Sequence, residues 1–180
     1  HLSGLKRARD AGIAPPVASL HVTNSFIINA AASYRTKQGT YVAYRVNANN
    51  LAAFRINPAN PPTITSAWNV SQSGVGSPFV TSTDGTSNVI VWAVGSGGDQ
   101  RLHGYDGDTG AVIFGGGGPS DTVAGTHSYS TTGIAARRGI YVAGDNKVYK
   151  FNVPGGTPTP TPTATATPTA TATFTPTSTP

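Results

Sequence analysis

The sequence predicts an all-β protein, and three observations support this prediction. The chain contains no Glu and no Met, and Leu is scarce, so several of the strongest helix formers are absent or rare. Val, Ile, Thr and Tyr are frequent and are separated by Gly and Asn, which is typical of short strands joined by turns. Hydrophobic segments of strand length also recur along the chain at a nearly constant spacing.

The recurring segments define repeat units. They are residues 40–44, 88–94 and 139–144. Measured from Tyr41 to Ile90 and from Ile90 to Tyr141, the steps are 49 and 51 residues. A second strand is predicted after each of these segments, at residues 51–56, 102–106 and 148–153. Since both sets of strands recur in the same order, we expect repeated supersecondary units.

Further strands are predicted in the intervals, at residues 25–31, 63–68, 77–82, 111–114 and 132–136. A group of four short strands in about fifty residues is the blade of a β-propeller. The predicted units are residues 25–76, 77–126 and 127–156. A propeller usually closes with about four to eight blades. We therefore expect a partial or multi-chain β-propeller of about three four-stranded blades, either the C-terminal part of a larger propeller or one completed by other chains. The alternative is a β-sandwich whose hairpins are similar.

A turn motif in the second unit resembles a known family. Asp106, Thr109 and Gly110 match the blade motif of quinoprotein-type (pyrroloquinoline quinone repeat-like) β-propellers, in which Ala-x-Asp-x-x-Thr-Gly precedes a Trp. Gly104 replaces the Ala of this motif, and Phe114 replaces its Trp. We expect Asp106 to accept hydrogen bonds within a tight turn and Gly110 to supply a positive φ. The resemblance covers about residues 25–153 and implies that Phe114 packs between adjacent blades.

The same resemblance suggests pyrroloquinoline quinone and an oxidoreductase, but the residues for this chemistry are missing. Catalytic members of the family use acidic calcium ligands that include Glu, and often a vicinal cysteine pair; this chain has neither Glu nor Cys. We therefore expect no cofactor and no catalytic residue. A fragment of a quinoprotein-like oxidoreductase is kept as an alternative.

Other patterns that could carry chemistry are incomplete. Asp106 and Asp108 have the spacing of calcium-loop ligands, but Gly110 stands where a third ligand would lie. The histidines lack the close spacing of zinc sites and are His1, His21, His103 and His127. No metal site is predicted.

The net charge of +5 comes from few, scattered basic residues, which disfavours nucleic acid as a partner. No apolar run is long enough for a membrane span.

The C-terminal segment, residues 157–180, places Thr at every second position among Pro and Ala, and no charged residue follows Lys150. Such a segment has too few large apolar side chains to form a core, and its prolines favour an extended, polyproline-II-like backbone. It resembles the O-glycosylated stalks of secreted proteins. The alternative is a flexible spacer with bare hydroxyls. Asn69 begins an Asn-Val-Ser sequon and is a candidate N-glycosylation site. The candidate O-glycosylation sites are Thr157, Thr159, Thr161, Thr163, Thr165, Thr167, Thr169, Thr171, Thr173, Thr175, Thr177 and Thr179.

These features predict a non-enzymatic extracellular structural or adhesive protein, such as a subunit of a surface layer, fibre or matrix. Its expected partners are other copies of itself, the remaining blades of a larger propeller, and glycans. Residues 1–24 are expected to be a linker or inter-blade segment, and the start at His1 suggests a processed product or a fragment. A carbohydrate-binding propeller is a further alternative, with stacking platforms chosen from Tyr34, Tyr41, Tyr44, Trp68 and Trp92.

Overall fold

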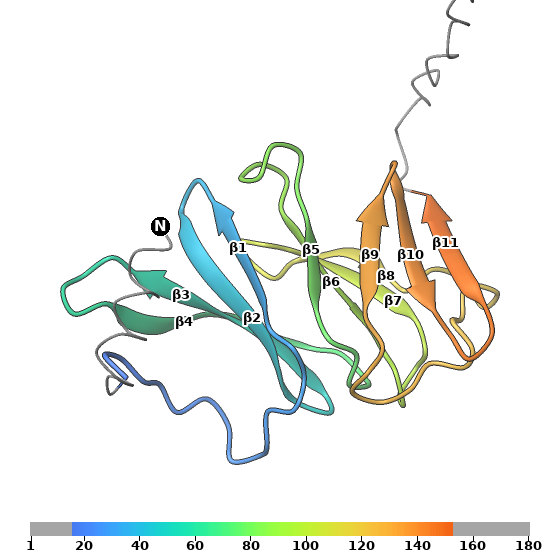
Figure 1. Ribbon diagram of the computed structural model, residues 1–180, viewed down its shortest axis with the longest axis horizontal. Coiled ribbons are helices and arrows are strands. Elements are labelled where there is room, and N and C mark those ends of the chain that lie inside the picture. The colour runs from blue at the N-terminus through green and yellow to red at the C-terminus, as the bar shows by residue number, and fades with distance from the viewer. Residues whose placement is uncertain (1–15, 153–180) are drawn as a thin grey trace, which may run out of the picture.

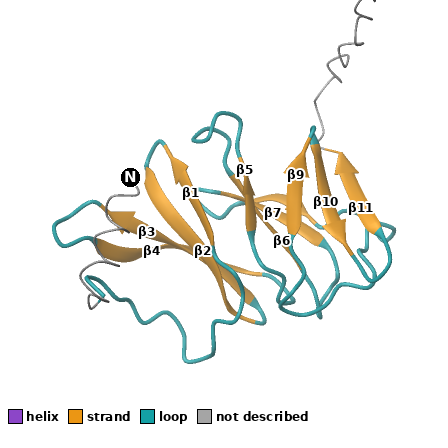
Figure 2. Ribbon diagram, in the orientation of Figure 1, coloured by secondary structure: helices purple, strands orange, loops and turns teal. Residues whose placement is uncertain are grey.

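The computed structural model describes residues 16–152, and this part of the chain consists of strands and loops (Figures 1 and 2). Eleven strands form three antiparallel sheets of four, four and three strands. Within each sheet, every ladder joins strands that are adjacent in the chain. The all-β prediction is confirmed. The described residues contain no helix that is long and apolar enough to cross a membrane.

The first sheet contains the longest strands: β1 (Ala32–Thr36), β2 (Gly39–Asn47), β3 (Asn50–Asn57) and β4 (Thr63–Ser71). In β2 the buried residues Tyr41 and Ala43 alternate with half-buried Val42 and Tyr44, as expected for a sheet with two unequal faces. A tight turn joins β2 to β3, and there the amide N–H of Asn49 donates to Oδ1 of Asn47 at 2.8 Å. This Asx-type contact explains why the chain reverses at an Asn-rich segment.

The second sheet contains β5 (Phe79–Thr81), β6 (Ile90–Val94), β7 (Leu102–Asp106) and β8 (Val112–Gly115). The third sheet contains β9 (Gly133–Ala136), β10 (Gly139–Ala143) and β11 (Val148–Asn152). Each predicted unit thus holds one sheet, although the third sheet has three strands within the described residues.

The strand predicted at residues 25–31 is wrong. The opening strand, β1, begins at Ala32, and the apolar residues Phe26 to Ile28 lie exposed in the loop before it. The pairing explains the difference, because Tyr34 lies opposite Tyr41 and is buried with it between two sheets. A consecutive apolar run is buried only where a neighbouring sheet covers it. The alternating pattern of residues 32–36 was therefore the better signal of the strand β1.

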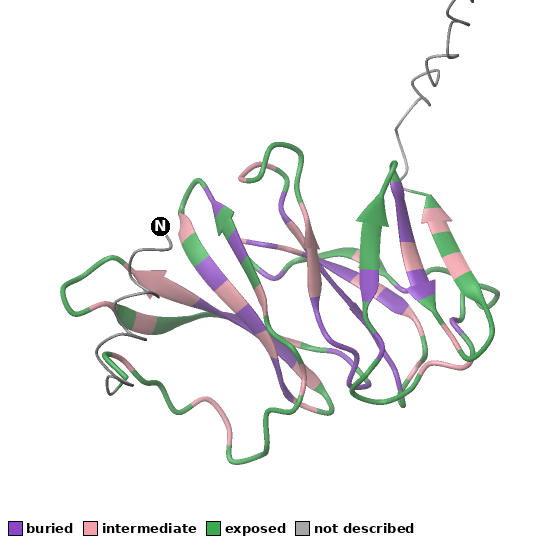
Figure 3. Cartoon of the chain, in the orientation of Figure 1, coloured by how far each residue is buried: buried purple, intermediate pink, exposed green. Residues whose placement is uncertain are grey.

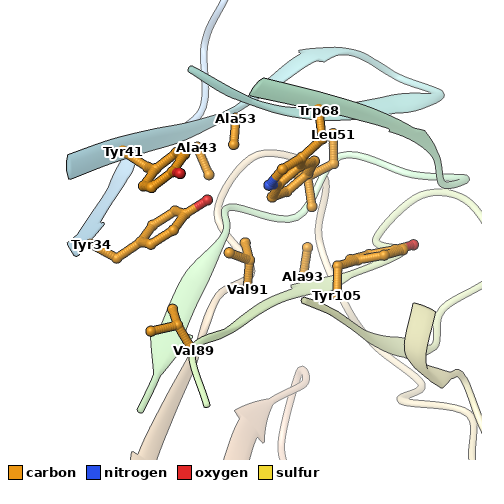
Figure 4. Packing of buried hydrophobic residues seen from close by; sticks show 10 residues of the cluster. All are labelled: Tyr34, Tyr41, Ala43, Leu51, Ala53, Trp68, Val89, Val91, Ala93 and Tyr105. Atoms are coloured by element: carbon orange, nitrogen blue, oxygen red, sulfur yellow. The ribbon is translucent and has the colours of Figure 1, made fainter. Parts of the chain in front are cut away.

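The three sheets pack face to face through two hydrophobic clusters. The cluster between the first and second sheets is shown in Figure 4 and contains Tyr34, Tyr41, Ala43, Leu51, Ala53, Trp68, Val89, Val91, Ala93 and Tyr105. Within it the rings of Tyr34 and Tyr41 stack with centroids 5.2 Å apart. The cluster between the second and third sheets contains Trp92, Val94, Leu102, Val123, Ile140 and Val142.

The first strands of successive sheets are also neighbours: β1 contacts β5, and β5 contacts β9 (Figure 1). The sheets are therefore arranged side by side in chain order, with one face of each turned toward the next sheet. The predicted stalk at 157–180, the candidate O-glycosylation sites in it, and the first part of the predicted linker lie outside the described residues.

Candidate functional site

The turn that follows β7 is organised by the carboxylate of Asp106. Its Oδ1 accepts hydrogen bonds from the amide N–H groups of Asp108 and Thr109, at 3.1 and 2.9 Å, and from the hydroxyl of Thr109 at 2.8 Å. The amide N–H of Gly110 donates to the Asp106 carbonyl at 2.9 Å. Gly110 has a φ of 73°, in the left-handed region that favours glycine. We call residues 106–110 the docking turn.

The docking turn contacts the first sheet through a backbone carbonyl. The oxygen of Gly107 accepts a hydrogen bond from the Tyr34 hydroxyl at 2.7 Å and another from the Trp68 indole N–H at 2.9 Å. A third bond runs from the Thr36 hydroxyl to Oδ1 of Asp108 at 2.6 Å. Burial raises the pKa of the Tyr34 phenol, so this donor stays protonated in the folded chain.

Trp68 also packs against the docking turn. A Cβ added to Gly110 would lie 3.0 Å from Cγ and Cδ2 of the Trp68 ring. The glycine therefore serves two purposes, since it adopts the positive φ of the turn and leaves room for the indole. The ring that reaches this turn comes from β4 of the preceding sheet.

Phe114 lies on the other side of the second sheet. It is half-buried against the cluster between the second and third sheets, and its ring centroid lies 6.2 Å from that of Trp92. Gly104, which replaces the Ala of the family motif, faces the same tryptophan: a Cβ there would lie 2.6 Å from Cζ3 of Trp92. The indole of Trp92 therefore occupies the space that an alanine side chain would need.

The third sheet has one face that no other sheet of residues 16–152 covers. Tyr141 lies opposite Ile134 on one side and Lys150 on the other, so these side chains share a face, and Ile140 and Val142 occupy the opposite face toward the second sheet. Ile134 is 65% exposed and Val148 is 70% exposed. In Figure 3 most of the strand that contains Ile134, β9, has the colour of exposed residues. We call this surface the outer face; it consists of Ile134, Ala136, Tyr141, Ala143, Val148 and Lys150.

Matching residues in the other two sheets are buried. Leu51, Leu102 and Val148 lie at the beginning of the third strand of their sheets. Leu51 and Leu102 are 0% and 1% exposed, each packed in the cluster that its sheet forms with the next one. Val148 is turned toward the corresponding side, where the described residues provide no next sheet.

The proposed sugar-stacking aromatics belong to the core. Tyr34, Tyr41, Trp68 and Trp92 are buried, and Tyr44 is half-buried against Phe54, with ring centroids 6.2 Å apart. The four buried rings have no face open to a sugar in this structure.

The other predicted residues do not come together. Asn69 is exposed on β4, where its Oδ1 accepts a hydrogen bond from Nδ2 of Asn50 at 2.9 Å. His103 pairs with Asp99 at 2.7 Å, and His127 pairs with Asp145. Within residues 16–152 no group of three or more His, Cys, Asp or Glu side chains is placed to hold a metal ion.

Comparison with protein-family models, with curated proteins and with solved structures finds no match to this chain. The quinoprotein-type resemblance therefore stays a prediction, based on Asp106, Thr109 and Gly110 and on the repeat in which they lie.

Proposed function

We propose that the chain is a non-enzymatic extracellular structural or adhesive protein, built as an open β-propeller that continues by packing another sheet on its outer face. This proposal rests on the exposure of Val148. Its counterparts Leu51 and Leu102 are each buried by the next sheet, whereas Val148 is 70% exposed. An apolar face that repeats the composition of two buried interfaces is typical of an interaction site.

The partner proposed for this face is a second copy of the chain. A sheet from another copy has the alternation of apolar residues that the two internal interfaces use. A contact between the outer face and a different surface of the next copy is heterologous, and heterologous contacts generate rings or filaments. This geometry suits a subunit of a surface layer, fibre or matrix.

The predicted stalk supports the extracellular part of the proposal. Residues 157–180 alternate Thr with Pro, Ala and single Phe and Ser residues, the composition of O-glycosylated stalks. A glycosylated, extended segment would hold the β-domain away from a surface and keep it hydrated.

Sedimentation velocity over a range of concentrations tests the association. We expect the chain to self-associate, the Val148→Lys variant to sediment as a monomer, and the Val112→Lys variant to behave like the unmodified chain. Val112 is the matched control, because it is a strand valine that is 66% exposed but lies on β8, outside the outer face. A chain that is monomeric at all concentrations, or a Val148→Lys variant that still associates, contradicts the proposed contact.

Intact mass of the protein from its native source, with peptide mapping across residues 157–180, tests the stalk. Excess mass in hexose-sized steps within this segment is the expected result. A mass equal to that of the bare sequence contradicts glycosylation and leaves the segment as a spacer.

A further inference from the structure

The first sheet has a second apolar face, turned away from the second sheet. In β2 the side chains of Tyr41 and Ala43 point toward the second sheet, so Val42 and Tyr44, which alternate with them, lie on the opposite face. The strand pairing places further apolar residues of β3 and β4 beside these two. We call this surface the receiving face; it consists of Val42, Tyr44, Ala52, Phe54, Ile56 and Ile64.

Part of the chain before β1 crosses the receiving face. Val22 packs there against the buried cluster that includes Ala52 and Phe54. Val17 and Leu20, in the same segment, are 69% and 42% exposed. Residues 17–22 therefore cover part of the receiving face and extend it with exposed apolar side chains.

This segment also lacks charge. No Asp, Glu, Lys or Arg lies between Asp10 and Arg35. Charged residues are depleted at the centre of protein–protein interfaces, and exposed apolar patches mark surfaces that another molecule covers. An uncharged surface segment with exposed Val17 and Leu20, next to an apolar sheet face, is therefore typical of an interface.

The receiving face corresponds to the faces through which the other two sheets contact the sheet before them. Val91 and Ala93 of β6 pack toward the first sheet, and Ile140 and Val142 of β10 pack toward the second. No sheet of residues 16–152 precedes the first one, so its corresponding face has no sheet against it there. In Figure 1 the first sheet lies at one end of the row of sheets, and the third sheet, with its outer face, lies at the other.

We propose that the outer face of one copy packs on the receiving face of the next copy, so that the second copy continues the series of sheets. This inference rests on the proposed self-association and names the second surface of that contact. Because the two surfaces are different and lie at opposite ends of the row, the contact is heterologous and joins copies head to tail. The receiving face has no charged residue, so no like charge opposes Lys150 of the outer face.

Sedimentation velocity of two complementary variants tests this contact. Leu20→Lys places a charge beside the receiving face and leaves the outer face intact, and Val148→Lys does the reverse. Each variant alone should associate at least about tenfold more weakly than the unmodified chain, because a lysine buried in an apolar contact loses its hydration. A 1:1 mixture should form a dimer, in which the outer face of the Leu20→Lys variant meets the receiving face of the Val148→Lys variant. Both free ends of this dimer carry a lysine, so it should not grow further.

Ile113→Lys is the matched control, because Ile113 is 52% exposed on β8, outside both surfaces. It adds the same charge and should associate like the unmodified chain. If Leu20→Lys does not fold, Val17→Lys replaces it, since Val17 is 69% exposed. A folded Leu20→Lys or Val17→Lys variant that associates like the unmodified chain overturns the inference, as does a mixture that stays monomeric. In either case a monomeric Val148→Lys variant still supports self-association through the outer face, whereas an unmodified chain that is monomeric at all concentrations overturns both proposals.

Discussion

The indole N–H of Trp68 on β4 donates to the carbonyl oxygen of Gly107 in the next sheet, at 2.9 Å. The same oxygen accepts the hydroxyl of Tyr34 on β1 at 2.7 Å. Two strands at opposite edges of the first sheet therefore share one acceptor in the second sheet. Both bonds are buried, where an acceptor left without a partner is costly.

This shared acceptor predicts a non-additive pair of substitutions. Tyr34→Phe should cost about 1 kcal/mol of unfolding free energy, because Trp68 still satisfies the carbonyl. Combined with Trp68→Phe, it should cost about 1–2 kcal/mol more than the sum of the two single changes, since the carbonyl is then buried without a donor. Urea unfolding followed by circular dichroism measures these values.

A second double-mutant cycle, in which Trp92→Phe replaces Trp68→Phe, provides the control for this pair. Trp92 donates its indole N–H to the Thr81 hydroxyl within the second sheet, at 2.8 Å, and shares no partner with Tyr34. Trp92→Phe and Tyr34→Phe should therefore be additive. Equal coupling in the two cycles would show that the Gly107 carbonyl is not the source of the effect.

Gly110→Ala should destabilise the chain more than Gly85→Ala. Both glycines have positive φ, 73° and 87°, so both substitutions strain the backbone. A Cβ at Gly110 would also press on the Trp68 ring at 3.0 Å, whereas nothing lies within 4 Å of a Cβ at Gly85. We expect a difference of about 1–3 kcal/mol, the usual cost of overpacking. Equal unfolding free energies for the two variants would mean that Trp68 moves away freely.

Gly104→Ala restores the residue of the family motif and should nevertheless destabilise this chain by about 1–3 kcal/mol. The added Cβ would lie 2.6 Å from the Trp92 ring, while a Cβ at Gly115, in β8 of the same sheet, would make an ordinary contact at 3.7 Å. Gly115→Ala is therefore the control and should have a much smaller effect. A stable Gly104→Ala variant would show that the Trp92 ring can shift without cost.

Stability should fall in alkaline solution above pH 10. Burial raises the pKa of the Tyr105 phenol from 10.0 to about 12, and burial likewise raises the pKa of Tyr34. Below pH 10 both phenols are neutral in the folded and the unfolded chain, so their contribution is fully present. Between pH 10 and 12 the unfolded chain loses these protons first, and the unfolding free energy falls by about 1.4 kcal/mol per pH unit for each tyrosine. Burial lowers the pKa of Arg45 to about 10, so this group contributes a rise in the same window and makes the net slope smaller.

Urea unfolding between pH 8 and 11.5 measures this slope. Tyr34→Phe should make the fall less steep, because the proton of one buried phenol is removed from the balance, while Tyr41 and Tyr105, whose pKa values burial also raises, still contribute. Tyr129→Phe is the control, since Tyr129 is 51% exposed, and it should leave the slope unchanged. A Tyr34→Phe variant with the slope of the unmodified chain would contradict the assignment of the titrating group.

The sequence predicted the strands well where alternation and turn residues agree. The bounds predicted for residues 102–106 match β7, which is followed by the turn that Asp106 and Gly110 organise. The opening strand was misplaced, because an apolar run outweighed the alternation in residues 32–36. The error arose because two sequence signals conflicted at this point, the apolar run in residues 25–31 and the alternation in residues 32–36.

The candidate sites were harder to predict, because they depend on contacts between units. The acceptor of Trp68 is a backbone carbonyl. Every residue has such a carbonyl, so the sequence does not show which one accepts the bond. Arg45 did carry a signal, since it has the same parity in β2 as Tyr41 and Ala43, so the alternation already predicts that this arginine is buried. The exposure of Val148 could be recognised only by comparison with Leu51 and Leu102 in three dimensions.

Every ladder in the described residues joins strands adjacent in the chain, and the sheets meet through side chains, turns and a few backbone bonds of the connecting loops. Duplication or deletion of a whole unit would therefore break no strand ladder, although loop bonds such as that from the Ser77 N–H to the Thr131 carbonyl, at 2.9 Å, would have to form again with the new neighbour. Such a protein can change length during evolution in steps of one unit. The similarity between the hydrophobic segments around Tyr41, Ile90 and Tyr141 is what gene duplication followed by divergence would leave.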